Sequence, residues 1–294
     1  MQRFDGHTHL RVPNADPHRL IAQLETAGMT GAAVISVPPE GYTIMNATAP
    51  YEERVADVLA FTAAYPDRLF PLLWVHPDEP DICRKVADAA TRGVLGFKMI
   101  CNNYYVYEDK AMRLLQAIAA TGKPVLFHSG ILWDGAVSSC YNKPVNWECC
   151  LEIPYLKFAL AHVSWPWCDE NLALYGKFLN AYTKRPDLSV EMFVDITPGT
   201  PPIYRREVLT KLHTIGYDIR HNLLFGTDGR ADDYNGAWCR QWQQTDDAIY
   251  ADLGLSEDTV AATYGGNLLR FLGLSDETVT HMAQTADGRK ETVK

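Results

Sequence analysis

"RFDGHTHL", residues 3–10, is a short, largely apolar stretch that ends on two histidines, His7 and His9, one residue apart. In a β-strand, residues i and i+2 project to the same side, so the two imidazoles would stand together at the end of this strand. Such a pair could bind one metal ion, or it could be two polar residues that end a strand. The choice depends on whether the rest of the chain supplies further ligands at compatible places.

Seven further apolar, β-branched runs follow along the chain, most of them succeeded by a turn signal and a helical stretch. Parallel strands buried on both faces read as near-continuous apolar runs, and eight β–α units in about 250 residues fit a barrel. We therefore predict an α/β fold, a (β/α)8 TIM barrel in a single domain over residues 1–274, followed by a polar tail, 275–294. A doubly wound open sheet is less favoured, because no G-x-G-x-x-G follows the first strand. The seven runs are residues 31–37, 69–75, 93–100, 124–130, 157–164, 188–197 and 222–229.

The composition is that of a soluble globular protein able to bury a large core, and we expect its partner to be a small-molecule substrate. Its 294 residues carry a formal net charge of −9, which disfavours binding to the phosphate backbone of nucleic acid. No apolar stretch approaches the ~20 residues needed to cross a bilayer, and no basic segment followed by an apolar one opens the chain. We expect a cytoplasmic protein without a nucleic-acid or membrane partner, and homo-oligomerisation stays open. The seven irregularly spaced cysteines contain no C-x-x-C pair, so reduced thiols are expected.

Residues able to bind a metal gather at the carboxyl ends of the predicted strands, where barrel enzymes place their active residues. Neutral imidazole and carboxylate are good zinc ligands, and a catalytic site leaves one coordination position for water. The ion lowers the pKa of that water to roughly 7, and a neighbouring carboxylate can take its proton. The sequence thus predicts a divalent metal site at these strand ends. The residues placed there are His7, His9, Lys98, His128, His162 and Asp228.

A set of motifs in a fixed order extends over nearly the whole chain. His-x-His follows Asp-Gly at the start, Gly-Phe-Lys lies in the fourth run, Phe-His-Ser-Gly in the fifth, Ala-His in the sixth and Gly-Thr-Asp in the eighth. "GGNLLRFLGL", residues 265–274, closes the series. With these motifs the chain resembles the amidohydrolase superfamily. It looks closest to the branch that holds aminocarboxymuconate-semialdehyde decarboxylase and pyranone dicarboxylate lactonase.

The resemblance implies roles for individual residues. His7, His9, His128 and Asp228 would bind a divalent metal, usually zinc, and Asp228 would also shuttle a proton. His162 would bind a second ion or polarise the substrate. Members with two metals often bridge them with a carboxylated lysine on strand four, where Lys98 stands. Single-metal sites are usual in this branch, and Lys98 can then face a substrate anion, so we expect one Zn²⁺ and a second only if Lys98 is carboxylated.

The loops after the predicted strands offer candidates for substrate binding. Tyr105 and Trp133 belong to a group of loop aromatics that could line a pocket for a planar or apolar substrate, or pack the loops together. Arg230, two residues after Asp228, could meet a substrate carboxylate or be a solvated arginine. The long insert at about 130–156 looks like a lid or an oligomer contact.

Two reactions fit this set of residues. The first is that of a metal-dependent hydrolase, which uses a metal-activated water on an amide, a lactone or another carboxyl ester. The alternative is a metal-dependent non-oxidative decarboxylase of an aromatic or unsaturated carboxylic acid, because the branch uses one ligand set for both. A phosphoesterase of the TatD type is disfavoured, since Lys98 stands where that type is expected to carry glutamate.

Overall fold

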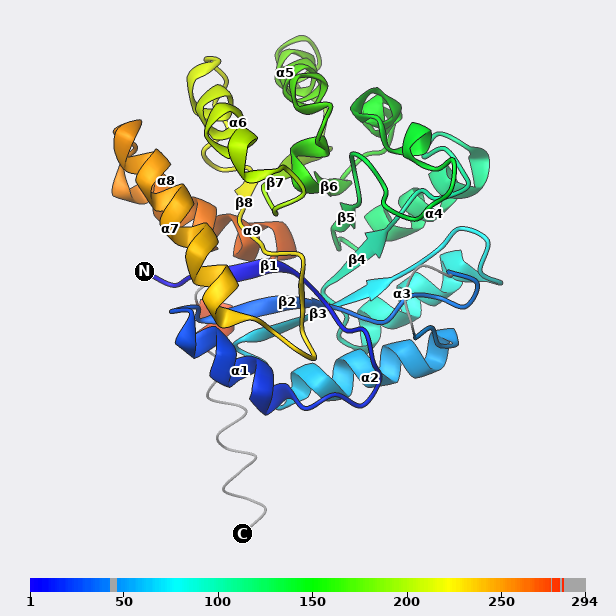
Figure 1. Cartoon of the computed structure of the whole chain (residues 1–294). Helices are drawn as coiled ribbons and strands as arrows, with labels where there is room; N and C mark the ends of the chain where they lie inside the picture. Colours follow the sequence, from blue (N-terminus) through cyan, green and yellow to red (C-terminus); the bar gives the residue numbers. More distant parts are fainter. Residues whose placement is uncertain (43–46, 276, 281, 283–294) are drawn as a thin grey trace.

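One parallel sheet forms the centre of the protein (Figure 1). The computed structural model describes residues 1–42, 47–275, 277–280 and 282. The strands pair in the order β8-β7-β6-β5-β4-β3-β2-β1-β9, and every pair is parallel. They are β1 (Phe4–His9), β2 (Gly31–Ile35), β3 (Leu69–Trp74), β4 (Gly96–Met99), β5 (Val125–Phe127), β6 (Lys157–Leu160), β7 (Glu191–Asp195), β8 (Leu223–Leu224) and β9 (Gly229–Arg230).

The eighth predicted run is divided between two strands. We predicted one strand over 222–229, but β8 pairs with β7 whereas β9 pairs with β1, and residues 225–228 separate them. Asp228 has a φ of 56°, in the left-handed region, so the strand is interrupted just before β9. The Gly6 amide donates to the Phe225 carbonyl at 2.9 Å, which brings the last part of the sheet against the first. The curled sheet is a TIM-barrel-like α/β fold, as the spacing of the apolar runs predicts.

Most of the helices cover the outer face of this sheet (Figure 1), whereas residues 267–272 pack against the cluster inside it. Each of the first seven follows a strand in the chain, in agreement with the predicted alternation. The α-helices are α1 (Pro17–Thr26), α2 (Tyr51–Ala63), α3 (Ile82–Arg92), α4 (Asp109–Ala120), α5 (Cys168–Lys184), α6 (Pro202–Thr214), α7 (Gly236–Asp252), α8 (Glu257–Ala261) and α9 (Asn267–Leu272). The shorter helical segments are η1 (Ser139–Asn142), η2 (Pro144–Glu152), η3 (Ala161–Ser164) and η4 (Ala262–Gly266).

The core has two layers because each strand buries both of its faces. On β3, Leu69 and Leu73 pack outward with the helices, whereas Phe70, Leu72 and Trp74 belong to a second cluster inside the sheet. Successive residues of a strand point to opposite faces, which produces this separation. Burial on both faces explains why the strands read as continuous apolar runs.

The insert at 130–156 is attached to the sheet through buried side chains. Trp147 of η2 is fully buried, and its ring lies 5.4 Å from that of Phe127 on β5. The Asn142 side chain donates to the Cys101 carbonyl at 2.8 Å. These contacts anchor the base of the insert, and its role as a lid or an oligomer contact stays a prediction.

The end of the chain is described in part. Val279 is buried against the inner cluster, in a helical segment at 277–280. The rest of the predicted tail, residues 276, 281 and 283–294, lies outside the described residues, so the boundary predicted at 274 stays a prediction. No helix in the described part is long and apolar enough to cross a membrane.

Candidate metal centre

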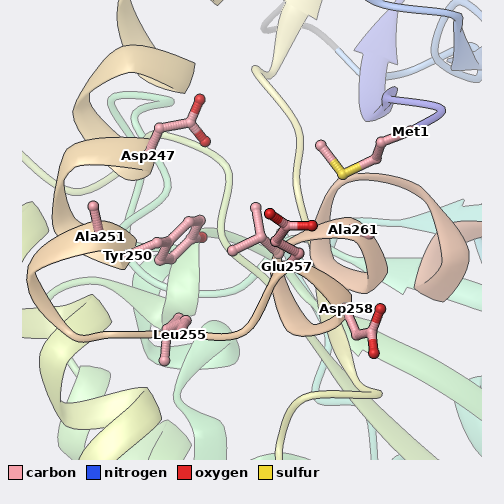
Figure 2. Close-up of a pocket in the computed structure, with 9 residues that line it drawn as sticks. Met1, Asp247, Tyr250, Ala251, Leu255, Glu257, Asp258 and Ala261 are labelled. Carbon is pink, nitrogen blue, oxygen red and sulfur yellow. The ribbon is translucent and has the colours of Figure 1, made fainter.

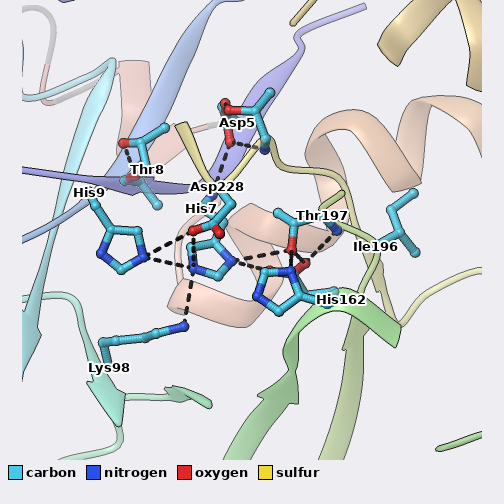
Figure 3. Close-up of polar contacts among 12 residues, drawn as sticks. Asp5, His7, Thr8, His9, Lys98, His162, Ile196, Thr197 and Asp228 are labelled. Carbon is cyan, nitrogen blue, oxygen red and sulfur yellow. Dashed lines mark hydrogen bonds and ion pairs between the residues drawn. The ribbon is translucent and has the colours of Figure 1, made fainter. Parts of the chain in front are cut away.

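Three side chains, two from β1 and one from the turn before β9, converge beside the sheet (Figure 3). Within the described residues, His7, His9 and Asp228 form the group whose potential metal-binding atoms all lie within 4.8 Å of one another. The Nε2 atoms of His7 and His9 are 3.1 Å apart, and Asp228 Oδ1 lies 3.5 Å from the first and 3.3 Å from the second. Both histidines are buried, whereas the Asp228 side chain is 38 % exposed. The cluster is therefore accessible from one side.

Asp5 holds β1 and the Asp228 turn together. Its buried carboxylate accepts hydrogen bonds from the His7 amide at 3.1 Å, the Thr227 amide at 2.9 Å and the Tyr234 hydroxyl at 2.7 Å. Burial raises the pKa of Asp5 to about 6, so at neutral pH it is ionised and accepts all of these bonds. One carboxylate thus places His7 and Asp228 next to each other.

The distances suit a divalent ion. Zinc binds imidazole nitrogen and carboxylate oxygen at about 2.0–2.2 Å, so ligands of a tetrahedral site stand about 3.3 Å apart. The three separations of 3.1, 3.3 and 3.5 Å lie around this value. His7 Nδ1 is 2.9 Å from Asp195 Oδ2, an outer carboxylate contact that leaves Nε2 as the metal-binding atom. The residues present therefore fit a metal.

The protonation states also suit metal binding. Burial lowers the pKa of His9 to about 4, despite the opposing effect of Asp228, so its ring is neutral at pH 7. Burial raises the pKa of Asp228. The neighbouring histidines His7, His9 and His162 lower it by more than burial raises it, so the net pKa is well below its usual range. Neutral imidazoles beside an ionised carboxylate are the forms that bind zinc.

Lys98 and His162 lie beside the cluster, and their roles in an active site stay predictions. Lys98 of β4 is 1 % exposed, and its Nζ is 3.1 Å from His7 Nε2. Burial lowers the pKa of Lys98 to about 8. The His162 ring stacks on that of His7 with centroids 5.5 Å apart, and its Nδ1 is 3.0 Å from Thr197 Oγ1.

His128 lies next to the cluster but has a different contact. Its ring is 5.1 Å from that of His162, while its Nε2 is 3.2 Å from the Ile131 carbonyl oxygen. Among the described residues, the group of converging ligand atoms does not include His128. Metal binding by His128 stays a prediction.

The predicted substrate-binding residues lie in the loops and contact other partners. The Tyr105 ring stacks on that of Tyr107, with ring centroids 4.9 Å apart. Trp133 is 75 % exposed and stacks on Trp165, with ring centroids 6.4 Å apart. Arg230 forms an ion pair with Asp232 and is partly exposed. These contacts agree with loop packing and a paired arginine, and substrate binding by the three residues stays a prediction.

The prediction from sequence missed two residues that contact the cluster, Asp195 and Thr197. Asp195 is the last residue of β7 and is 1 % exposed, and Thr197 follows two residues later. The signal was present in "MFVDIT", where a carboxylate ends an apolar run.

A cavity of about 440 Å³ lies elsewhere, between α7 and α8 (Figure 2). Its lining includes Asp247, Tyr250, Leu255 and Glu257, and it shares no residue with the cluster of His7, His9 and Asp228. This cavity is therefore separate from the candidate metal centre.

Comparison with solved structures finds the same fold in several proteins. A probable 2-pyrone-4,6-dicarboxylic acid hydrolase from Acinetobacter baumannii, with citric acid bound, is 13 % identical with a TM-score of 0.60, covering 93 % of this chain and 100 % of that one. Dihydroorotase from Campylobacter jejuni is 14 % identical with a TM-score of 0.57, covering 93 % of this chain and 84 % of that one. Amidohydrolase 2 from Bifidobacterium longum subsp. infantis is 15 % identical with a TM-score of 0.56, covering 94 % and 100 %. At these identities the likeness shows the fold alone.

Comparison by sequence gives the family. A search of curated proteins found no match. The model of the family described as amidohydrolase matches residues 4–274, which include both ends of the sheet and every residue of the cluster. The resemblance carried by the ordered motifs is confirmed, and the chain belongs to the amidohydrolase family.

Proposed function

We propose that this protein is a metal-dependent hydrolase that cleaves an amide, a lactone or another carboxyl ester with an activated water. The observation that carries the proposal is the convergence of His7, His9 and Asp228 at separations suited to one ion. Membership of the amidohydrolase family supports the same class of enzyme. A probable 2-pyrone-4,6-dicarboxylic acid hydrolase from Acinetobacter baumannii shares the fold, which agrees with that class.

His7, His9 and Asp228 would hold the ion at the carboxyl ends of the strands, with His128 as the further ligand that the resemblance implies. A bound divalent ion, most simply Zn²⁺, would polarise the substrate carbonyl and lower the pKa of a water to about 7. Asp228 is ionised and 38 % exposed, so its carboxylate can accept a proton from that water and return it to the leaving group.

Lys98 would contact the substrate beside His7 Nε2. Its ammonium is buried with Nζ 3.1 Å from His7 Nε2, and a buried cation needs an anionic partner. A substrate carboxylate would supply that partner, and carboxylation of Lys98 would instead supply a ligand for a second ion. His162 stacks on His7 and would face the same substrate or the second ion.

Metal analysis of protein purified without chelator tests this proposal. We expect about one divalent ion per chain, or two if Lys98 is carboxylated. The double variant His7→Ala, His9→Ala should lose both the metal and the activity because it removes two ligands. His221→Ala, which changes an exposed histidine outside the cluster, should keep both. Metal-free wild-type protein with full activity would contradict the proposal.

A substrate panel separates hydrolysis from decarboxylation. Lactones, amides and carboxylated aromatics would be incubated with the metal-loaded protein while acid release and carbon dioxide release are followed. Hydrolysis releases acid and places one oxygen from ¹⁸O-labelled water in the product. Carbon dioxide release without uptake of that oxygen would overturn the hydrolase in favour of the decarboxylase.

A further inference from the structure

We propose that Asp195 and Thr197 are positioning residues that determine which ring nitrogen carries the proton in both His7 and His162. In each imidazole the proton is held on Nδ1, and Nε2 is left as an acceptor. The use of this arrangement rests on the proposed metal-dependent function, but the arrangement itself is a property of the metal-free protein.

Asp195 has three hydrogen-bond contacts with His7 and Thr197. Its Oδ2 is 2.9 Å from His7 Nδ1, and its Oδ1 accepts from the Thr197 amide at 2.6 Å and from the Thr197 hydroxyl. The residue is 1 % exposed, so no water competes for these bonds. Burial raises the pKa of Asp195, but His7, His162 and Thr197 together outweigh it, so the net pKa lies below its usual range and the carboxylate is ionised. An ionised carboxylate can only accept hydrogen bonds. His7 Nδ1 must therefore donate, and the proton of a neutral His7 ring resides on Nδ1.

Thr197 extends the same constraint to His162 (Figure 3). A threonine hydroxyl has one proton, and Thr197 gives it to Asp195. Thr197 Oγ1 can then only accept from His162 Nδ1, which lies 3.0 Å away. The proton of a neutral His162 ring therefore also resides on Nδ1, and Nε2 on the opposite edge of the ring is an acceptor. One carboxylate thus sets two imidazoles that come from β1 and η3.

Two glycines leave the room that this arrangement needs. A Cβ on Gly226 would lie 2.6 Å from Thr197 Cγ2 and 2.9 Å from His7 Cβ. A Cβ on Gly199 would lie 2.8 Å from Cβ of His162. A side chain at either position would therefore displace Thr197, His7 or His162, so glycine is needed at both for these three residues to keep the partners described above.

The arrangement matters because only the unprotonated nitrogen of an imidazole can bind a metal ion or accept a proton. Lys98 Nζ lies 3.1 Å from His7 Nε2 and favours the same tautomer. Without Asp195 that contact alone would oppose a proton on His7 Nε2, which lies 3.1 Å from His9 Nε2 in the middle of the cluster. Outer hydrogen-bond partners of metal-binding histidines typically change metal affinity by about 10–100-fold. Asp195 is expected to have an effect of that size.

The test uses the full chain and four variants: Asp195→Asn, Thr197→Val, Thr197→Ser and, as a control, Thr245→Val on the exposed face of α7. Two-bond ¹H–¹⁵N correlation spectra of the metal-free proteins report which nitrogen of each histidine is protonated. Competition with a chromophoric chelator gives the Kd for Zn²⁺. Wild type should show protonated Nδ1 at both His7 and His162.

Each variant has its own expected result. Asp195→Asn should shift the tautomer of His7 and weaken Zn²⁺ binding by about 10–100-fold. Thr197→Val should change the tautomer of His162 with a smaller effect on His7, and Thr197→Ser, which keeps the hydroxyl, should restore the wild-type spectrum. Thr245→Val should resemble wild type throughout.

The outcomes separate this inference from the proposed function. Wild type with a protonated Nε2 at either histidine, or Thr197→Val with an unchanged His162 spectrum, would overturn the inference. If Asp195→Asn does not fold, the Thr197 pair still decides. A wild-type protein with the expected tautomers that does not bind Zn²⁺ would leave the inference intact and count against the metal-dependent hydrolase.

Discussion

Lys98 is a single residue whose buried charge lowers the free energy of unfolding of the metal-free protein. Burial lowers its pKa to about 8 from 10.5. Below pH 8 the lysine is charged in the folded and the unfolded chain, and the full cost of burying the charge is about 3 kcal/mol. Between pH 8 and 10.5 the folded protein releases the proton while the unfolded chain keeps it, so the free energy of unfolding rises with pH.

We therefore predict that Lys98→Met makes the metal-free protein about 3 kcal/mol more stable at pH 7 and that this gain vanishes towards pH 10.5. Urea unfolding at a series of pH values measures both effects. Lys184→Met, at an exposed position near the end of α5, should show no such dependence on pH. A constant difference between Lys98→Met and wild type would show that the lysine keeps its ordinary pKa.

At the scale of elements, the segment that joins β8 to β9 passes very close to Thr197 and His7. Gly226 lies between β8 and β9, where a Cβ would contact Thr197 and His7 at 2.6 and 2.9 Å. Gly226→Ala should cost about 1–3 kcal/mol of stability through overpacking and should weaken Zn²⁺ binding by displacing His7. Gly266→Ala is the matched control, since nothing lies within 4 Å of a Cβ there. It should be neutral or up to about 1 kcal/mol stabilising, because alanine favours helix.

Two neighbouring helices are joined by a buried ion pair. Arg205 of α6 and Asp246 of α7 are both buried and lie 2.6 Å apart between Nη2 and Oδ2. Arg205→Met should cost about 3–5 kcal/mol, because it leaves the Asp246 carboxylate buried without its partner. Arg206→Met, which breaks the exposed pair with Asp252, should cost less than about 1 kcal/mol. Adding Asp246→Leu to Arg205→Met should recover most of the loss, and chemical denaturation would measure all four proteins.

At the scale of the whole molecule, a bound metal would link β1, through His7 and His9, to the turn at Asp228. Ligand at a thousandfold excess over its Kd stabilises a folded protein by about 4 kcal/mol. For a chain of this size 1 kcal/mol shifts Tm by roughly 2–4 °C, so chelation should lower Tm by roughly 10 °C. Scanning calorimetry with and without chelator would measure the change. The double variant His7→Ala, His9→Ala should have one Tm under both conditions, and a wild-type Tm that ignores chelator would contradict a metal in the cluster.

The sequence by itself determined the order of strands and helices, the strand ends on His7 and His9, and the family. These features depend on residues close together in the chain, where apolar periodicity and turn residues act locally. The near-continuous apolar runs were sufficient because burial on both faces of a parallel sheet imposes them. The approach of His7, His9 and Asp228 followed from the rule that parallel strands end on one side of a barrel.

Only the tertiary structure decided which of these residues touch. It split the eighth strand, directed His128 Nε2 to the Ile131 carbonyl and placed Asp195 against His7, 188 residues away in the chain. It also showed that Asp5, next to the histidine pair in the sequence, is the carboxylate that joins β1 to the Asp228 turn. Hydrogen bonds of this kind depend on ångström-scale distances between distant segments. Those distances are set by the packing of the whole core, to which the local pattern of residues is insensitive.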